Sequence, residues 1–434
     1  MLMTMSTTHE RDANVPGGRP LMSRGGAGGV DVGGGHRLAA GGGTLSAYEY
    51  LPWDDPEFER DPYPWFARAQ AEVPVLRDTD GTIVVLRYDD ILEYGKRPTM
   101  SVEPNWEKAG PWSIARQSVI AQDPPKHTQL RRQTSRWFTP KIVRDWVTTT
   151  AAVTNEILDG ATGDVVDGWW DLSAVPTHRT MCRILQFADD DVIGVVHDMA
   201  DTMPMLSALP REGTIEQAAG GFNRLARRVT PMLDAKHHTP GDGLADALLA
   251  AHRRGEITEE EARATTLLLY SLGHMDVGYA IAAGLHIFAR LPEVWDDFRT
   301  DPSVRDAIIN EIIRYDPPEL SFYRVPTEDV TIRGVDIPAG STVRFVIAAA
   351  NRDPEIFADP HRFDHGRPQE RSHNLSFGLG PHSCLGQVIS RAEARTVFEV
   401  LAARFRRLEL TGPVQMDNTD FSRHFTAMPL RLVR

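Results

Sequence analysis

The segment from about residue 127 to residue 315 limits the possible folds of this chain more than any other feature. Its apolar residues recur at helical spacing, and the signals that predict β-strands are few. Such a long helical segment fits poorly with an alternating βαβ architecture, in which strands and helices follow each other in turn. We therefore expect a mainly α fold with small β-sheets, of the α+β class.

Shorter elements are expected on both sides of this segment. On its N-terminal side, the sequence predicts a helix over residues 65–72 and a β-branched strand over residues 82–86. On its C-terminal side, we expect short strands between residues 324 and 346 and a helix over residues 387–405. Strands and turns should make up the tail, residues 407–434.

The N-terminus differs from the rest of the chain. Twelve glycines lie between Gly17 and Gly43, and aliphatic residues show almost no periodicity there. Because such a segment buries too little apolar surface to offset its ordering entropy, we predict that residues 1–44 are a disordered glycine-rich extension. Residues 45–434 should then form a single folded domain.

Composition excludes several classes of protein. The chain has 47 Lys and Arg residues against 60 Asp and Glu residues, a formal net charge of −13, which argues against a general nucleic-acid binder. Two cysteines are too few for a disulfide framework. No apolar run reaches membrane-spanning length, and no secretory signal is visible at the N-terminus. We expect a cytoplasmic protein that does not enter a membrane.

A glycine-rich loop surrounds Cys384 and leads directly into the predicted helix 387–405. Its sequence is Phe377-Gly378-Leu379-Gly380-Pro381-His382-Ser383-Cys384-Leu385-Gly386. Glycines let a backbone approach a flat cofactor, and backbone N–H groups at a helix N-terminus stabilise a thiolate. This arrangement suits a sulfur that ligates iron. The alternative is a small buried residue in a turn, and that is the role we predict for Cys182 within a helix.

The ten residues of this loop resemble the haem-binding signature of the cytochrome P450 family, Phe-Gly-x-Gly-x-His-x-Cys-x-Gly. Every specified position matches: Phe377, Gly378, Gly380, His382, Cys384 and Gly386. The resemblance covers about residues 48–434. It implies the cytochrome P450 fold, with a single triangular haem domain, and haem b (iron protoporphyrin IX) as the cofactor. It also implies that Cys384 ligates the iron and that Phe377 and Gly386 contact the haem.

Glu311 and Arg314 stand three residues apart, so they share one helix face just before the helix stop Tyr315-Asp316-Pro317-Pro318. Many helices carry such a pair by chance. Here the pair looks like the family's Glu-x-x-Arg motif. The resemblance implies that Arg362, in the segment Pro360-His361-Arg362-Phe363, completes a structural network behind the cysteine loop without a direct chemical role.

Four basic residues match the family's contacts to the haem propionates. His127 and Arg131 are four residues apart, hence on one face of a helix, and Arg324 follows the proline turn. His382 lies in the cysteine loop. Basic donors suit carboxylates because charge strengthens their hydrogen bonds. The alternative for the helical pair is an ordinary solvated face.

Thr258 and Glu261 form a capping box at the start of an apolar run. We expect this helix to continue to Arg290, which gives a length of ~48 Å at about 1.5 Å per residue. Gly273 lies in its interior, where glycine costs roughly 1 kcal/mol relative to alanine. It permits either close packing of two helices or, as the resemblance implies, room for dioxygen beside the iron.

The sequence departs from the family pattern just after Gly273. The family usually places an acid and a threonine there to relay protons during oxygen activation. Alignment on Gly273 puts Met275 at the acid position and Asp276 at the threonine position, whereas a shift by one residue would leave Val277 at the alcohol position. The threonine is missing in either case. Asp276 could deliver protons itself, the substrate could supply the hydroxyl, or Asp276 could bind a polar substrate group.

The substrate region is placed by family position. The stretch from Met100 to Ile114, with Trp106 and Trp112, should cover the distal pocket, although any of its residues could be plain core. The other candidates for substrate contact are Met275, Leu320, Ser321, Phe322, Phe425 and Thr426. These residues suit a small, largely apolar aromatic or terpenoid-like substrate.

The resemblance is strongest to the soluble bacterial type of cytochrome P450. It implies a monooxygenase that inserts one oxygen atom from O₂ into an organic substrate. Electrons would come from a ferredoxin and its reductase, because no flavin or Fe–S segment is visible in the sequence. An acidic ferredoxin would dock on the cysteine side, where Arg132, Arg136 and Arg395 are candidates for steering it. We expect a monomer.

Two other functions stay open. One is a haem-thiolate enzyme that does not hydroxylate and instead couples or rearranges its substrate, which the missing threonine favours. Its peroxide-driven version lacks the Arg-Pro pair that marks the family's peroxygenases. The other is a non-enzymatic haem or ligand-binding protein, against which the intact cysteine loop and Gly273 argue.

Overall fold

The structure is a computed structural model that describes residues 46–103, 116–188, 191–203, 213–368, 373–419 and 421–434. The predictions for residues 1–44, for Trp106 and Trp112 and for the rest of residues 104–114 lie outside these ranges. All described residues fall within one compact unit of the chain.

Helices account for most of the ordered elements, as the sequence predicts. The α-helices are α1 Ala47–Tyr50, α2 Pro56–Arg60, α3 Tyr63–Glu72, α4 Tyr88–Tyr94, α6 Lys126–Ser135, α7 Pro140–Gly160, α8 Val175–Leu185, α9 Val192–Ala200, α10 Thr214–His238, α11 Leu244–Arg253, α12 Glu259–Arg290, α13 Pro292–Thr300, α14 Arg305–Tyr315, α15 Ile347–Ala350 and α16 Gln387–Arg404. Short helical turns are η2 Val119–Ala121, η3 Trp170–Ala174, η5 Pro302–Val304 and η7 Gly380–His382.

The strands form small sheets on both sides of the helical segment. They are β1 Val75–Arg77, β2 Ile83–Val85, β3 Met100–Ser101, β4 Val165–Asp167, β5 Phe322–Pro326, β6 Val330–Ile332, β7 Val335–Ile337, β8 Val343–Phe345, β9 Arg407–Leu410, β10 Gln415–Asn418, β11 Arg423–Ala427 and β12 Pro429–Val433. The largest sheet has the order β1-β2-β8-β5-β3, in which only β2 and β8 pair in parallel. The strands predicted over residues 82–86, 324–346 and 407–434 are thereby confirmed.

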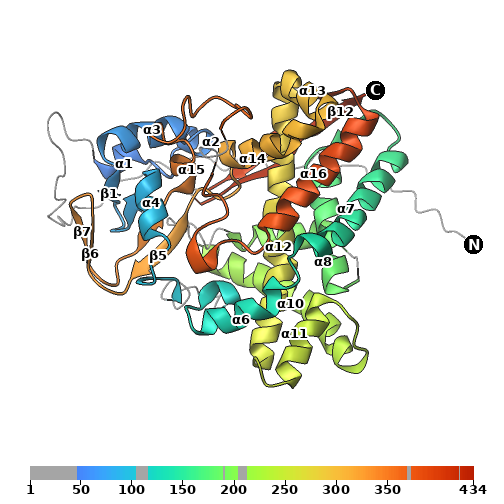
Figure 1. Cartoon of the computed structure of the whole chain (residues 1–434), viewed down its shortest axis with the longest axis horizontal. Helices are drawn as coiled ribbons and strands as arrows, with labels where there is room; N and C mark the ends of the chain where they lie inside the picture. The colour runs from blue at the N-terminus through green and yellow to red at the C-terminus, as the bar shows by residue number, and fades with distance from the viewer. Residues whose placement is uncertain (1–45, 104–115, 189–190, 204–212, 369–372, 420) are drawn as a thin grey trace, which may run out of the picture. The chain divides into compact units, whose positions relative to one another are not determined.

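Helix α12 is the central element of the helical part. Figure 1 shows it in yellow, passing behind α16. The capping box predicted at its start is present: the Thr258 hydroxyl accepts from the Glu261 backbone N–H, and the Glu261 carboxylate accepts from the Thr258 N–H at 2.9 Å. Helices α8, α11 and α16 and the turn η3 pack against α12. Because neighbours surround it, apolar residues occupy nearly all its faces.

Three hydrophobic cores hold the described residues together. The largest lies around α12 and includes Phe288, Trp295 and Phe398. Two smaller cores lie around the five-stranded sheet, where α3, α4 and α15 pack. Cys182 is buried in the largest core, as predicted. Within the described ranges, we find no helix that combines the length and the apolar character needed to cross a membrane.

Candidate active site

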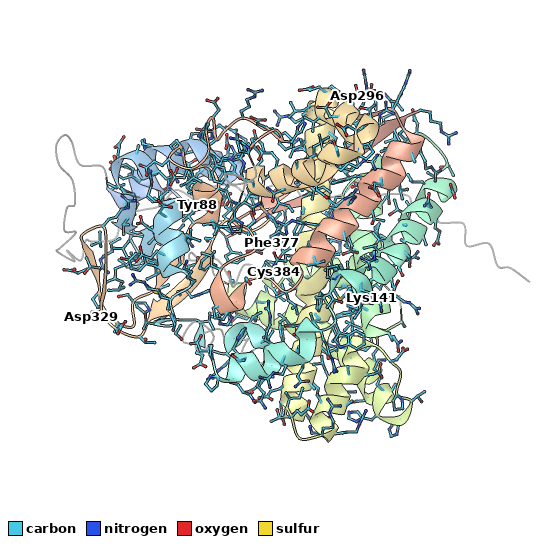
Figure 2. The ribbon with its side chains drawn as sticks, in the orientation of Figure 1. Tyr88, Lys141, Asp296, Asp329, Phe377 and Cys384 are labelled. Carbon is cyan, nitrogen blue, oxygen red and sulfur yellow. The ribbon has the colours of Figure 1, made fainter. Side chains whose placement is uncertain are left out.

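The loop before α16 folds back on itself around Cys384. The Cys384 backbone N–H donates to the Phe377 carbonyl at 2.6 Å, which closes the loop. Gly378 and Gly380 have φ angles of +66° and +64°, a conformation that residues with side chains rarely adopt. Figure 2 labels Cys384 and Phe377 near the start of α16.

Cys384 is an exposed residue, even though protein atoms surround its thiol closely. We infer from these two observations that Cys384 borders an interior space. Burial raises the pKa of the Cys384 thiol, and the Gly386 backbone N–H and the cations of Arg131 and Arg391 only partly oppose this. Backbone N–H groups alone thus stabilise the thiolate less than the sequence suggested. A bound metal ion would supply the missing stabilisation, because a thiol that coordinates a metal loses its proton.

One face of α12 borders the same interior space. Leu269, Leu272, Gly273 and Asp276 are partly accessible, whereas most residues between and around them are buried. Their spacing of three or four residues places them on a single helix face. The charge of Asp276 also raises the pKa of Cys384, so this face and the sulfur lie near each other.

Asp276, and not Val277, lies on this accessible face. Val277 is buried in the largest core. The alignment on Gly273, which puts Asp276 at the family's threonine position, therefore agrees better with the structure than the shifted alignment. Burial alone raises the pKa of the Asp276 carboxyl to about 7. This carboxyl group can consequently hold a proton and give it up near neutral pH.

Gly273 is also a packing residue. A Cβ atom at this position would lie 2.7 Å from Met181 Cε on α8, so the direction of its missing side chain is toward a neighbouring helix. The contact with α8 favours a small residue here, but packing alone does not require glycine, because the flexible end of Met181 can shift.

Three of the four predicted propionate residues form a tight group, and the fourth is linked to it by charge. The His127 and His382 ring centroids are 4.3 Å apart, and Arg131 Nη2 donates to the Ser383 carbonyl at 2.7 Å. Arg324 is 8% exposed, burial lowers its pKa to about 10, and the Asp123 carboxylate raises it. Asp123 Oδ1 lies 3.6 Å from His382 Nε2, an ion pair when the histidine is protonated.

These residues fit a haem. Nδ1 of His127 is buried and makes no hydrogen bond within the described structure, so this ring keeps one atom for a ligand, whereas Nε2 of His382 faces the Asp123 carboxylate. Buried cations and imidazole donors beside an accessible cysteine suit a flat cofactor that carries carboxylates. Haem carries two such groups and an iron ion that a thiolate can ligate.

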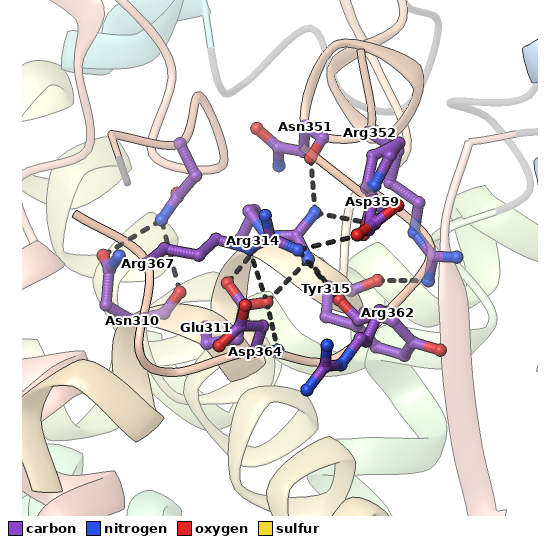
Figure 3. A network of polar contacts seen from close by, with 12 residues as sticks. Asn310, Glu311, Arg314, Tyr315, Asn351, Arg352, Asp359, Arg362, Asp364 and Arg367 are labelled. Atoms are coloured by element: carbon purple, nitrogen blue, oxygen red, sulfur yellow. Dashed lines mark hydrogen bonds and ion pairs between the residues drawn. The ribbon is translucent and has the colours of Figure 1, made fainter. Parts of the chain in front are cut away.

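Glu311 and Arg314 form the buried ion pair that the sequence predicts. Arg314 donates to both carboxylate oxygens at 2.7 Å, and to the carbonyls of Asn351 and Pro360 (Figure 3). The predicted third member is wrong. Arg362 is exposed and contributes its backbone carbonyl, whereas Arg367 Nε lies 3.1 Å from Glu311 Oε1 with its side chain 6% exposed.

The residues predicted to contact the substrate differ in their burial. Phe322 is partly accessible beside Arg324, whose guanidinium lies 4.6 Å from the ring centroid. Met275, Leu320 and Phe425 are instead buried in the hydrophobic cores, and their contact with a substrate stays a prediction. Met275 is buried because it leaves α12 on a face other than that of Asp276.

Glu319 is a candidate functional residue that the sequence reasoning missed. It follows Pro317 and Pro318 and is partly accessible, but protein surrounds it, and burial raises the pKa of its carboxyl well above the usual range. The charge of Asp276 raises this pKa further, so the two carboxyl groups lie close together. An acidic residue next to apolar residues predicted to face the substrate was the available signal.

The three arginines predicted to steer a ferredoxin differ in their surroundings. Arg132 and Arg136 are exposed on or next to α6, which contacts the cysteine loop through Arg131. Arg395 pairs with Asp306 at 2.7 Å and with Glu399 at 2.9 Å, so its charge is largely compensated. It is therefore a weak candidate for attracting an acidic partner.

Comparison with known proteins identifies the family. Residues 196–430, more than half of the chain, match the family model described as Cytochrome P450. This chain belongs to the cytochrome P450 family. Nocardicin C N-oxygenase of Nocardia uniformis subsp. tsuyamanensis is 29% identical over 385 residues, which are 83% of this chain and 92% of that protein.

Two further relatives agree with this cytochrome P450 assignment. Erythromycin C-12 hydroxylase of Saccharopolyspora erythraea is 30% identical over 363 residues, 79% of this chain and 87% of that protein. The crystal structure of ligand-free CYP164A2 of Mycobacterium smegmatis is 28% identical, with a TM-score of 0.81 over 89% of this chain and 100% of that one. The protein is a cytochrome P450 monooxygenase, and its predicted fold and haem cofactor class are confirmed.

Proposed function

We propose that this cytochrome P450 binds haem b through Cys384 and inserts one oxygen atom from O₂ into a small organic substrate with a largely apolar body. The observation that carries the proposal is the exposed residue Cys384, whose thiol lies among protein atoms and within reach of the charge of Asp276 on α12. The activities named for the similar proteins, a hydroxylase and an N-oxygenase, support an oxygen insertion.

Different residues of the chain would bind the haem and transfer protons. His127, Arg131, Arg324 and His382 would hold the haem propionates, and Phe377 and Gly386 would pack beside the thiolate. When bound, a haem with a thiolate ligand supplies the oxygen-activating chemistry. Asp276 would hold and transfer a proton at its carboxyl oxygen, in place of the missing threonine.

Electrons would come from a ferredoxin and its reductase. An acidic ferredoxin would approach the cysteine side, where Arg132 and Arg136 are exposed. We further propose that the protein acts in the cytoplasm as a monomer, which size-exclusion chromatography with light scattering would test.

A spectrum of the reduced, carbon monoxide-treated protein tests the central bond. We expect the long-wavelength Soret band of thiolate ligation in the wild type and its loss in Cys384→Ala, with Cys182→Ala as the matched control that keeps it. A native protein whose band lies where histidine ligation places it would contradict the proposal, as would a chain that takes up no haem when haem is supplied.

A coupling or rearrangement reaction is the second candidate. It is favoured by Asp276 and Val277, which leave no hydroxyl at the position where the family usually has threonine. Product analysis with ¹⁸O₂, NAD(P)H and surrogate redox partners separates the two candidates. Incorporation of one labelled oxygen atom supports monooxygenation, whereas an unlabelled coupled or rearranged product supports the second candidate.

A further inference from the structure

Two carboxyl groups share the interior of this protein without a basic partner. Asp276 belongs to α12, and Glu319 belongs to the segment that connects α14 with β5. In the described part of the chain, burial is the only influence on the pKa of Asp276, and burial and Asp276 are the only influences on that of Glu319. No lysine, arginine or histidine offsets either charge there. A buried carboxylate without a partner is costly, so two adjacent ones require an explanation.

Unpaired polar groups stand beside these carboxyls. Glu319 Oε2 is a buried atom without a hydrogen-bond partner, and so is Ser321 Oγ, on a side chain that is 2% exposed. Glu319 and Ser321 are two residues apart in an extended segment, so they lie on one side of it. Leu320, between them, is buried in the core on the opposite side.

The hairpin β10–β11 lies next to the segment that contains Glu319. His424 is 6% exposed, and its Nε2 has no hydrogen-bond partner. Its ring stacks on Tyr279 of α12, with the centroids 4.0 Å apart. Tyr279 feels the charges of both Asp276 and Glu319, which raise the pKa of its phenol after burial has raised it. An isolated bridge between Glu319 and Ser422 ties the same segment to this hairpin.

The charge and polarity of these groups indicate which class of ligand would bind between them. A positive charge placed between the two carboxyls would stabilise their ionised forms, whereas a neutral hydroxyl would leave them protonated. A divalent metal ion fits less well, because no group of three or more potential ligands gathers anywhere in the residues described. Leu269 and Leu272 on the accessible face of α12, and Phe322 three residues after Glu319, are apolar and suit the carbon skeleton of an organic cation.

We propose that Glu319, with Ser321 and His424 beside it and Asp276 opposite, forms a subsite for a cationic amine of the substrate. This inference rests on the proposed function, because the subsite lies beside the space that the Cys384 sulfur faces. It narrows the substrate class to amines with an apolar body that carry a positive charge near neutral pH. In this subsite Glu319 orients the substrate.

Binding of an isosteric pair of probes tests the subsite. Benzyltrimethylammonium and neopentylbenzene differ in one atom, nitrogen for carbon, and the quaternary ammonium cannot ligate iron. With the haem-loaded full-length protein, calorimetry or the Soret shift should show the ammonium binding about tenfold tighter or more. In Glu319→Gln, this ratio of affinities should fall by about tenfold, while the affinity for neopentylbenzene stays within about twofold.

Glu328→Gln is the matched control, because it makes the same chemical change at an exposed position. It should leave the ratio unchanged. A wild type that binds the neutral probe as tightly as the ammonium, or a Glu319→Gln variant with an unaltered ratio, would overturn the subsite. The thiolate band with carbon monoxide is recorded on the same samples. An intact band with no preference for the cation rejects the subsite alone, whereas a missing band rejects the proposed function.

Discussion

At the scale of single residues, three interior carboxyl groups differ in ways that assign them different roles. Burial raises the pKa of Asp276 to about 7, that of Glu393 to about 8, and that of Glu319 well above its usual range. Asp276 and Glu319 border the interior space, whereas Glu393 is buried where α7, α8 and α16 meet, and accepts from the Thr150 hydroxyl at 3.1 Å. All three residues are carboxylic acids, so their surroundings, rather than their residue type, would assign them to proton transfer, substrate recognition or packing.

Replacement of Asp276 by Asn should uncouple electron use from product formation. The amide keeps the shape of the side chain but cannot give up a proton, so we expect product formation to fall by about 10²-fold. NAD(P)H oxidation should continue and the thiolate band should stay. In the wild type, coupled turnover should decline as the pH rises above about 7, because the proton donor is then lost, and this decline should disappear in Asp276→Asn. Unchanged coupling in the variant would exclude Asp276 as the donor.

Glu393→Gln should change how stability depends on pH. The pKa of Glu393 is raised in the folded state, so the native protein binds more protons than the unfolded chain between about pH 4.5 and pH 8. This residue therefore makes the wild type lose stability as the pH rises through that window. The loss should reach a few kcal/mol at most. Urea unfolding from pH 5 to pH 8 should show a shallower decline in Glu393→Gln, with Glu328→Gln matching the wild type.

At the scale of elements, α12 contains three glycines, and two of them, Gly273 and Gly284, have different neighbours. A Cβ at Gly273 would meet the flexible end of Met181, whereas a Cβ at Gly284 would lie 2.4 Å from Phe398 Cζ. Phe398 is fully buried, and its ring lies among Phe288 and Phe298, so it cannot move aside. The same substitution on one helix should therefore have different costs.

We expect Gly284→Ala to lower the free energy of unfolding by roughly 1–3 kcal/mol, because overpacking exceeds the gain in helix propensity. Gly273→Ala should change it by less than about 1 kcal/mol, since the end of Met181 can shift. Chemical denaturation of both variants measures the difference. Equal costs would show that the packing of α12 differs from the structure. A stable Gly273→Ala protein with slower oxygen binding would indicate that this glycine also makes room for dioxygen.

The polar network behind the cysteine loop offers a second contrast between elements. Removal of Arg367 leaves the Glu311 carboxylate, 3% exposed, with a single cation, whereas removal of Arg362 leaves the side-chain network intact. We expect Arg367→Ala to cost about 2–4 kcal/mol and to weaken haem retention. Arg362→Ala should stay within about 0.5 kcal/mol of the wild type. Thermal unfolding with haem absorbance reports both, and the reverse order of effects would restore Arg362 as the third member.

Local signals in the sequence predicted the elements well, and long-range contacts explain the failures. The capping box at Thr258 and the glycines of the cysteine loop act within a few residues, so α12 and the loop could be predicted directly. The choice between Arg362 and Arg367 depends on how the segment after α15 wraps around Glu311, which no local pattern encodes. Glu319 was missed because its significance appears only when α12 brings Asp276 beside it.

At the scale of the whole molecule, the net charge is −13, yet two arginines, Arg132 and Arg136, are exposed close to each other in the sequence. The acidic ferredoxin that we propose as the electron donor would be repelled by this net charge, so its docking would need a local positive patch. Arg132 and Arg136 are exposed, and α6 is tied to the cysteine loop by the contact of Arg131 with Ser383. These two arginines therefore lie on or next to the helix that contacts the loop of Cys384.

Charge reversal at this patch should slow electron delivery. We expect Arg132→Glu to lower the association rate of a reduced acidic ferredoxin by about tenfold at low salt. Because the Debye length shrinks to about 3 Å at 1 M salt, the difference from the wild type should nearly vanish there. Arg77→Glu, the same change at an exposed residue of β1, is the control and should have little effect. Stopped-flow reduction under carbon monoxide measures the rates. A loss of rate that does not depend on salt would indicate a local structural change. An equal loss of rate in Arg77→Glu would show that only the net charge matters. Either result would exclude Arg132 and Arg136 from ferredoxin docking.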